Sequence, residues 1–132
     1  MSRLQERIEN FNRAYKLFAM ARNEFVKNKS NDINKLALIQ SFEIVVELGW
    51  KVTKDFLNQK GVEVFTPRDS IKEAFAANIL PTAQIWIDMI NDRNTSSHEY
   101  NMDKADVILD KISSAYYDEL TRYKEQLGFI NE

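Results

Sequence analysis

Apolar residues recur at steps of three and four along the first part of the chain. This is the spacing of one face of an α-helix. Ser2 and Gln5 have the spacing of a capping box, and the pattern predicts a helix from about Ser2 to Asn28. Only Arg22 interrupts its apolar face. Either its charge reaches solvent near the helix end, or it pairs with a buried carboxylate. The apolar face consists of Leu4, Ile8, Phe11, Tyr15, Phe18 and Phe25.

A second helix is expected from about Ile33 to Gln59, with Asn31 or Asp32 as its N-cap. Its polar positions share one narrow arc, and most of the remaining circumference is apolar. A helix of this kind must bury two faces. A second copy of the chain is the simplest cover for the second face, with Trp50 or Phe56 as contributors. The polar arc contains Gln40, Glu47, Lys51, Lys54 and Asn58.

Two short helices are expected in the middle of the chain, after the irregular connection GVEVFTP. The first begins at Pro67, because a first-turn proline there follows Thr66 as a cap, and it runs to about Asn78. The second runs from about Thr82 to Arg93. Their inward positions are Ile71, Ala74 and Phe75 on the first helix, and Trp86, Met89 and Ile90 on the second.

A long last helix is expected from about Asp103, which is a good N-cap, to Leu127. Its stripe is Leu109, Ile112, Tyr116, Leu120, Tyr123 and Leu127. Long helices with short connections are typical of an antiparallel bundle. We therefore expect an all-α, up-and-down bundle of about five helices, forming a single domain over residues 1–132.

Composition narrows the classes of function. The net charge of −2 argues against nucleic-acid binding through an overall positive field, so any RNA contact would be local. A single histidine and no cysteine leave no plausible zinc site, and we expect no metal and no cofactor. The charged N-terminus and the lack of a long apolar run predict a soluble, cytoplasmic protein, with neither a membrane nor DNA as partner.

The stretch NDRNTSSHEY, residues 91–100, is the main candidate for chemistry. Arg93 comes four residues after Met89, so it shares that apolar face and needs a partner across the bundle. Phosphate-loop and nucleophile-elbow motifs are absent from the sequence. The alternative is an ordinary hydrogen-bond network at a helix C-terminus, where the dipole favours a histidine. The candidate site residues are Arg93, Asn94, His98 and Tyr100, with Ser97 as possible lining.

Glu43 is a further candidate for the lining of a site, because it lies at the edge of the polar arc of the second helix. From that edge its carboxylate would be solvated, would pair in the neighbourhood of Lys51, or would reach into the site.

The segments QSFEIVVELGWKVTKDFLNQKGVEVFTPRDSIKEAFAANIL and WIDMINDRNTSSHEY resemble the nucleotidyltransferase substrate-binding protein family of the HEPN group. The likeness covers roughly residues 36–101 by motif and the whole chain by helix pattern. It implies a homodimeric helical bundle encoded beside a minimal nucleotidyltransferase. The residues that carry it are Phe42, Glu43, Trp50, Lys51, Lys54, Asp55, Gly61, Pro67, Ile71, Ala74, Trp86, Met89, Arg93, Asn94, Ser97, His98 and Tyr100.

HEPN relatives with an R-x4-6-H motif are metal-independent ribonucleases. In toxin–antitoxin pairs the motif is R-x4-H-x-Y, and the partner transferase silences the nuclease by adding AMP to the tyrosine. Arg93, His98 and Tyr100 match that motif, and Asn94 matches the polar residue that often follows the arginine. The resemblance thus implies a ribonuclease toxin controlled at Tyr100.

The residue types suit this reaction. RNA carries its own 2′-OH nucleophile, an imidazole can move the proton, and a guanidinium can bind the phosphate. One histidine cannot be both acid and base, whereas a symmetric dimer would supply two. Two alternatives stay open: a non-catalytic subunit that presents substrate to a nucleotidyltransferase, and a bundle whose motif only stabilises a dimer.

Overall fold

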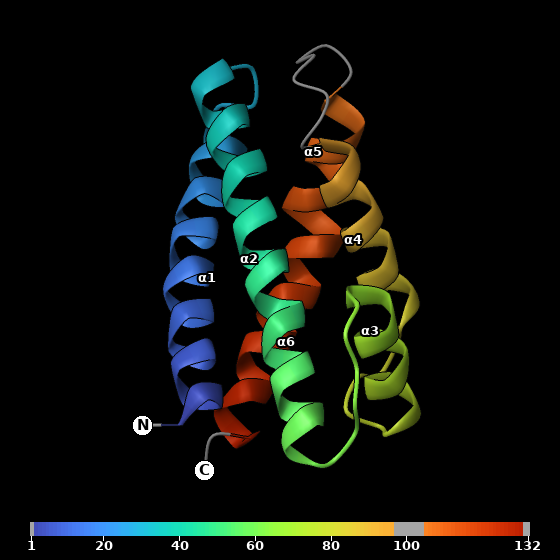
Figure 1. Cartoon of the computed structure of the whole chain (residues 1–132). Helices are drawn as coiled ribbons and strands as arrows, with labels where there is room; N and C mark the ends of the chain where they lie inside the picture. Colours follow the sequence, from blue (N-terminus) through green and yellow to red (C-terminus); the bar gives the residue numbers. More distant parts are fainter. Residues whose placement is uncertain (1, 97–104, 131–132) are drawn as a thin grey trace.

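The protein is a bundle of helices in the computed structural model, which describes residues 2–96 and 105–130. Two long antiparallel helices come first, two shorter ones follow, and the last three segments continue as one rod (Figure 1). All regular structure in the described ranges is helical, so the predicted all-α bundle is confirmed. The elements are α1 (Arg3–Lys27), α2 (Asp32–Gln59), α3 (Pro67–Ala76), α4 (Gln84–Ser96), α5 (Asp106–Lys111), η1 (Ile112–Tyr116) and α6 (Tyr117–Ile130).

Side chains cap the helices where the sequence predicts. The Ser2 hydroxyl accepts from the Gln5 backbone N–H at 3.1 Å, and the Gln5 side chain accepts from the Ser2 N–H at 3.0 Å. Asn31, not Asp32, caps α2, because its side chain accepts from the Asn34 N–H at 2.9 Å. These bonds satisfy backbone donors that the first turn of a helix leaves without partners.

The core forms where the stripes of α1 and the last rod meet α2. Phe11 lies edge-on to Tyr123, and Phe42 stacks on Tyr116 with ring centroids 5.5 Å apart. Both stripes are buried as predicted, except that Leu4 and Tyr15 of α1 are partly exposed. The buried positions of the last rod are Leu109, Ile112, Tyr116, Leu120, Tyr123 and Leu127.

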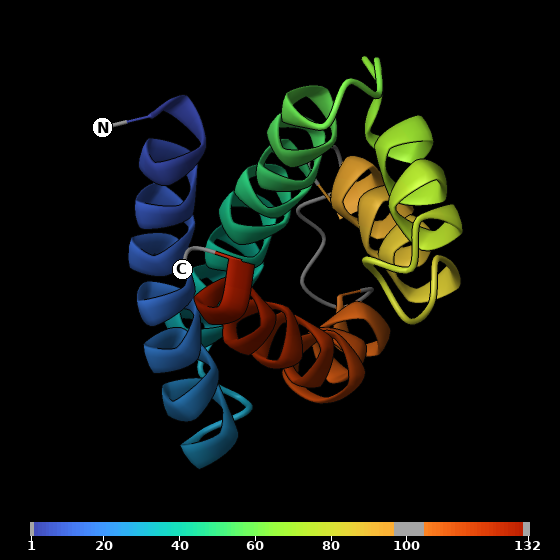
Figure 2. The same cartoon turned by 90° about the horizontal axis from the view of Figure 1, so that it is seen from below.

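The second apolar face of α2 is covered by the same chain. Seen along the bundle, α1 lies on one side of α2, while α3 and α4 lie on the other (Figure 2). Trp50 is only 9% exposed, so its expected place in a surface between two copies is wrong. The apolar side chains that α2 leaves exposed are Ile33, Leu36 and Ile44. Phe56, the other residue expected in a surface between two copies, is partly exposed. A homodimer stays a prediction.

Two further details differ from expectation. Phe75 is 49% exposed, because α3 is short and packs through the buried Ser70, Ile71 and Ala74. Helix α4 begins at Gln84 and continues past Arg93 to Ser96. The expected start of the last helix near Asp103 lies outside the described residues.

Arg22 stays partly exposed, and among the described residues it forms no ion pair with a carboxylate, so the second of its two expected arrangements is not found there. Its Nε donates to the backbone carbonyl of Ser113 at 3.0 Å, and its guanidinium lies 4.4 Å above the ring of Tyr117. Ser113 belongs to η1, a π-helical stretch with a wider turn than an α-helix. Arg22 therefore ties α1 to that wide turn.

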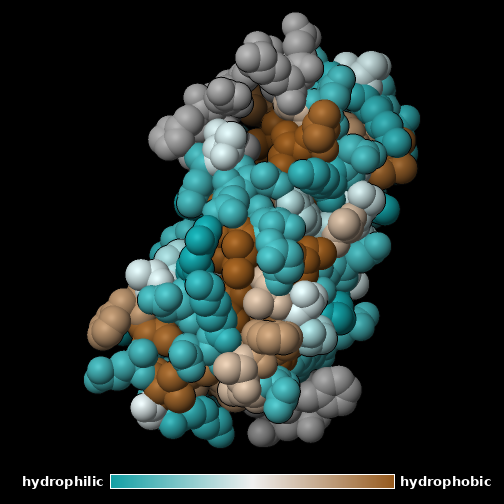
Figure 3. All heavy atoms as spheres, turned by 90° about the vertical axis from the view of Figure 1, so that its right-hand side faces the viewer, coloured by the Kyte–Doolittle hydropathy of each residue, from teal (hydrophilic) through white to brown (hydrophobic). Residues whose placement is uncertain are grey.

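The outer face of α3 and α4 mixes apolar and polar side chains, with apolar patches separated by polar groups (Figure 3). Within the described ranges, no helix has both the length and the apolarity to cross a bilayer.

Candidate functional site

Arg93 reaches from α4 across to a carboxylate on α2. Its Nη2 lies 3.3 Å from Oε2 of Glu47, and its Nη1 donates to Oδ1 of Asn94 at 3.2 Å. The Arg93 side chain keeps 33% of its surface exposed. The prediction that Arg93 points across the bundle toward a partner is therefore confirmed. A guanidinium held in this way can still contact a ligand.

Glu47 is held from three sides. Its carboxylate accepts from the indole Nε1 of Trp50 at 3.0 Å, and it lies 3.3 Å from Nζ of Lys51 as well as beside Arg93. Burial by itself favours the protonated carboxyl, but the Trp50 hydrogen bond and the two cations outweigh it, so the pKa of Glu47 lies below its ordinary value. Glu47 is thus an ionised anchor that fixes the direction of Arg93 at neutral pH.

A shallow pocket of about 240 Å³ lies beside this ion pair. Two carboxylates, two aliphatic side chains and one guanidinium line it: Glu43, Glu47, Ile44, Leu48 and Arg93. The structure therefore brings Glu43 to the same pocket as Arg93, which is one of the placements that the sequence left open. Such a lining can hold a charged group against the guanidinium and an apolar group against Ile44.

The neighbouring Asp92 faces a different element. Its Oδ2 accepts a short hydrogen bond from the Tyr116 hydroxyl, and Nζ of Lys111 lies 4.0 Å away. Burial and the adjacent carboxylate raise the pKa of Tyr116 well above its ordinary value, so the phenol stays protonated and donates. Sequence reasoning missed this contact because Tyr116 fits the apolar stripe of its helix. The only signal was a carboxylate directly before Arg93.

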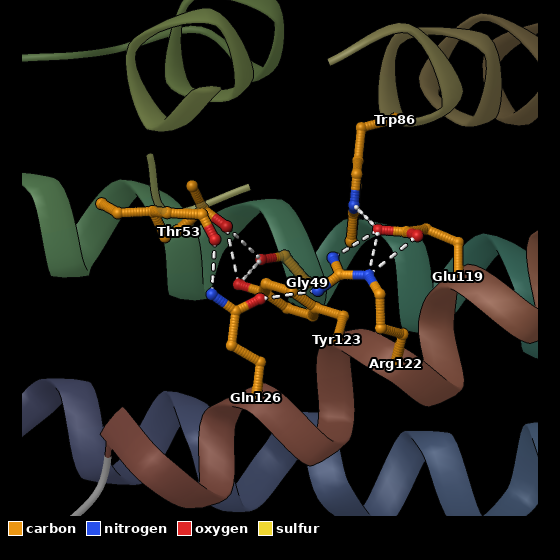
Figure 4. Close-up of polar contacts among 8 residues, drawn as sticks. Gly49, Thr53, Trp86, Glu119, Arg122, Tyr123 and Gln126 are labelled. Carbon is orange, nitrogen blue, oxygen red and sulfur yellow. Dashed lines mark hydrogen bonds and ion pairs between the residues drawn. The ribbon is translucent and has the colours of Figure 1, made fainter. Parts of the chain in front are cut away.

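Helix α4 is anchored at its other end by a buried polar cluster (Figure 4). Nε1 of Trp86 donates to Oε1 of Glu119 at 3.1 Å, and the same carboxylate receives the Arg122 guanidinium, with Nη2 at 2.5 Å. Glu119 is only 8% exposed. The cluster joins α4 to α6, which sets the height of α4 along the bundle.

A second set of buried bonds joins α6 to α2 next to this cluster. The hydroxyls of Tyr123 and Thr53 are 2.6 Å apart, and the Tyr123 hydroxyl lies 3.2 Å from the Gly49 carbonyl oxygen (Figure 4). Burial raises the pKa of Tyr123 far above its ordinary value. Gln126 adds a hydrogen bond to the carbonyl of Ile79, just before α4. Together these contacts hold the helix that carries Arg93.

Three of the predicted site residues, Ser97, His98 and Tyr100, lie outside the described residues. Of the other predicted residues, Arg93, Asn94 and Glu43 lie together around the end of α4 and the middle of α2. The spacing of Arg93 to His98 and Tyr100 is therefore a fact of the sequence, and their roles stay predictions.

The protein is an all-helical bundle in which an arginine of a short helix lies beside two carboxylates of a long one. The family model described as "Nucleotidyltransferase substrate binding protein like" matches residues 6–128. The chain belongs to this family. Comparison with curated proteins gave no significant match.

Proposed function

We propose that the chain is the helical partner of a nucleotidyltransferase and acts as a metal-independent endoribonuclease of the HEPN type. The observation that supports a ribonuclease is the environment of the Arg93 guanidinium. Its guanidinium is oriented by Glu47, remains partly exposed at a pocket, and precedes His98 by five residues. Membership of a family named for nucleotidyltransferases supports the choice of partner.

The reaction needs a base, an acid and a positive charge at the phosphate. The RNA 2′-oxygen attacks the adjacent phosphorus and its proton passes to an imidazole, while the bond to the 5′-oxygen breaks and that oxygen takes a proton. The products are a 2′,3′-cyclic phosphate and a 5′-hydroxyl. Arg93 stabilises the negative charge that develops on the phosphoryl oxygens, and His98 moves the protons.

A second copy of the chain supplies the second imidazole, because each chain has one histidine. Ile44 lines the pocket beside Arg93 and is 56% exposed, and Leu36 lies two turns before it on α2. Apolar side chains in this position support a homodimer in which two copies of the site face each other.

Control lies at Tyr100 in this proposal. The tyrosyl oxygen attacks the α-phosphorus of ATP in the partner enzyme, pyrophosphate leaves, and the phenolic proton is lost to solvent. The added AMP brings a phosphate to the neighbourhood of Arg93, where it occupies the place of the substrate phosphate. Inhibition then requires no change of the fold.

The nuclease is tested by cleavage of total cellular RNA with the purified chain in the presence of EDTA. His98→Ala should lower the rate by about 10²–10⁴-fold, which is the usual effect of losing one acid–base group. Arg93→Ala should also be impaired, and Arg13→Ala on the exposed side of α1 should match the wild type. Folded His98→Ala and Arg93→Ala proteins that cut as fast as the wild type contradict the catalytic assignment.

The modification is tested separately by intact-mass measurement. The chain is incubated with the minimal nucleotidyltransferase encoded beside it, ATP and magnesium. We expect mass increments of AMP that vanish in Tyr100→Phe and persist in Tyr15→Phe. An unchanged mass of the wild-type chain, with a transferase shown to be active, rules out the control at Tyr100.

The second candidate function is a non-catalytic subunit that holds substrate for the transferase. It is favoured by Glu43 and Glu47, since two carboxylates in one pocket suit a cationic, hydroxyl-bearing small molecule better than a phosphate. Kanamycin is a suitable probe. Binding in equilibrium dialysis that weakens in Glu43→Gln, together with no cleavage of RNA by the wild type, would decide for this candidate.

A further inference from the structure

Three consecutive residues near the end of α4 contact three different helical segments. Oδ1 of Asn91 accepts from Nη2 of Arg68 on α3 at 3.1 Å, Asp92 accepts from Tyr116 on η1, and Arg93 pairs with Glu47 on α2 at 3.3 Å. Successive residues of an α-helix point about 100° apart. Contacts on three sides therefore fix the rotation of this turn about the helix axis.

The three contacts differ in strength. The contact between Asn91 and Arg68 is exposed to solvent, so water competes with it. The Tyr116 residue is 4% exposed, and its hydrogen bond ends on a carboxylate, which makes the bond charge-assisted. The ring of Tyr116 is also fixed, because it stacks on Phe42 with an angle of 9° between the planes.

We propose that Asp92 and Tyr116 are positioning residues for Arg93. Arg93 has a long side chain, so a small rotation of α4 moves its guanidinium far from the direction set by Glu47. The hydrogen bond from Tyr116 to Asp92 resists that rotation from a side of the helix about 100° away from Arg93. This inference rests on the proposed ribonuclease for its effect on rate, but the restraint on α4 exists independently of it.

The charged neighbours of Asp92 support the same role. Lys111 on α5 lies 4.0 Å from Oδ2 of Asp92, the oxygen that accepts from Tyr116. Asp92 is therefore joined to both α5 and η1. This ion pair links α4 to α5, the described elements on either side of residues 97–104.

The hydroxyl of Tyr116 can be removed without emptying the core. Tyr116→Phe keeps the ring that stacks on Phe42 and deletes only the donor to Asp92. A matched control is Tyr15→Phe, which deletes a hydroxyl that lies 2.7 Å from Thr121 Oγ1, between α1 and α6. Both variants lose a phenolic hydrogen bond, but of these two hydroxyls it is that of Tyr116 that bonds to α4, through Asp92.

The kinetic test compares the two variants on RNA. Tyr116→Phe should lower kcat about 10-fold with KM within about twofold of the wild type, because a misplacement of about 1 Å can cost up to about 10² in rate. Tyr15→Phe should leave both constants unchanged. In an Arg93→Ala background, Tyr116→Phe should have no further effect, since the two residues act through one guanidinium. Asp92→Asn keeps an acceptor but loses the charge, so its kcat should lie between those of the wild type and Tyr116→Phe.

Two kinetic results would overturn the proposal. One is a kcat of folded Tyr116→Phe equal to that of Tyr15→Phe. The other is a Tyr116→Phe substitution that lowers kcat by the same factor in the wild-type and in the Arg93→Ala background. If Tyr116→Phe fails to fold, Asp92→Asn takes its place in both comparisons.

A readout without RNA separates this inference from the proposed function. Backbone amide hydrogen exchange over residues 91–96 should be several-fold faster in Tyr116→Phe than in Tyr15→Phe, with exchange in α1 alike. If the wild type cuts no RNA, the proposed ribonuclease fails and the exchange result alone judges the restraint. Equal exchange in the two variants would then refute it.

Discussion

The indole of Trp86 packs directly on the backbone of Gly49. A Cβ atom at Gly49 would lie 2.9 Å from Cη2 of Trp86 and 3.3 Å from the ring of Phe11. The indole cannot easily retreat, because its Nε1 is bound to Glu119. Helices α2, α4 and α6 therefore meet at a buried point where a glycine is required on α2.

Gly49→Ala should destabilise the fold in spite of the better helix propensity of alanine. The propensity gain is about 1 kcal/mol, whereas forcing an extra methyl into a packed core costs about 1–3 kcal/mol. We expect a net loss of up to about 2 kcal/mol in the free energy of unfolding, measured with urea. Gly128→Ala is the matched control. It is helical and exposed, with no atom within 4 Å of the added Cβ, and should gain up to about 1 kcal/mol.

Glu119 should be costly to replace by an apolar residue. Glu119→Leu leaves the indole N–H of Trp86 buried without its acceptor and removes the carboxylate that forms the ion pair with Arg122. We expect a loss of about 2–3 kcal/mol in the free energy of unfolding. Glu119→Gln keeps one acceptor and should lose less, and Glu125→Gln on the exposed side of α6 should lose almost nothing. Equal stability of Glu119→Leu and Glu125→Gln would contradict the role of the cluster.

Glu47 should make part of the stability depend on acid pH. Its pKa in the folded chain lies below the ordinary value of 4.5. A depressed carboxyl pKa stabilises the fold above the unfolded value, and the contribution is lost as the pH falls through the folded value. Urea unfolding between pH 6 and about 3 should therefore show a shallower decline for Glu47→Gln than for the wild type. The same neutralisation at the exposed Glu63 serves as the control.

Arg22 should not be replaceable by lysine. A lysine keeps the charge but loses the flat group that stacks on Tyr117 and the Nε donor to the Ser113 carbonyl. We expect Arg22→Lys to lower the free energy of unfolding by about 1 kcal/mol. Arg13→Lys, on the exposed side of α1, should stay within about 0.5 kcal/mol of the wild type. A lysine at position 22 that is as stable as the wild type would show that charge alone suffices.

Helical periodicity predicted the long elements well, because burial of a stripe is a local property of one helix. It failed for Trp50 and Phe75 for a physical reason. Apolar area can be removed from water by another helix of the same chain or by another molecule, and the sequence pattern is the same in both cases. Phe75 shows the opposite error. The pattern predicted that it is buried, but it is 49% exposed, since α3 is too short to be covered all round.

The polar contacts of the site were harder to predict. Glu119 and Arg122 have the spacing of an ordinary surface ion pair on one helix, and only the structure shows the indole of Trp86 beneath them. The place of Arg93 on an apolar face predicted that it has a partner across the bundle. Which residue this is, Glu47, depends on how far α2 and α4 are shifted along each other, and the sequence does not give that shift. The contact between Asp92 and Tyr116 had only a weak signal, the carboxylate directly before Arg93, because it joins residues 24 positions apart in the chain.

The positions of the helix ends in the bundle have a practical consequence for binding measurements. Helix α1 begins and α6 ends at the lower end of the bundle, whereas α4 runs toward the upper end (Figure 1). A biosensor chip, a fluorophore or a fused domain attached through either of those lower helix ends would point away from the last turns of α4. Immobilised chains would then share one orientation, with the guanidinium of Arg93 on the side that meets the flowing ligand.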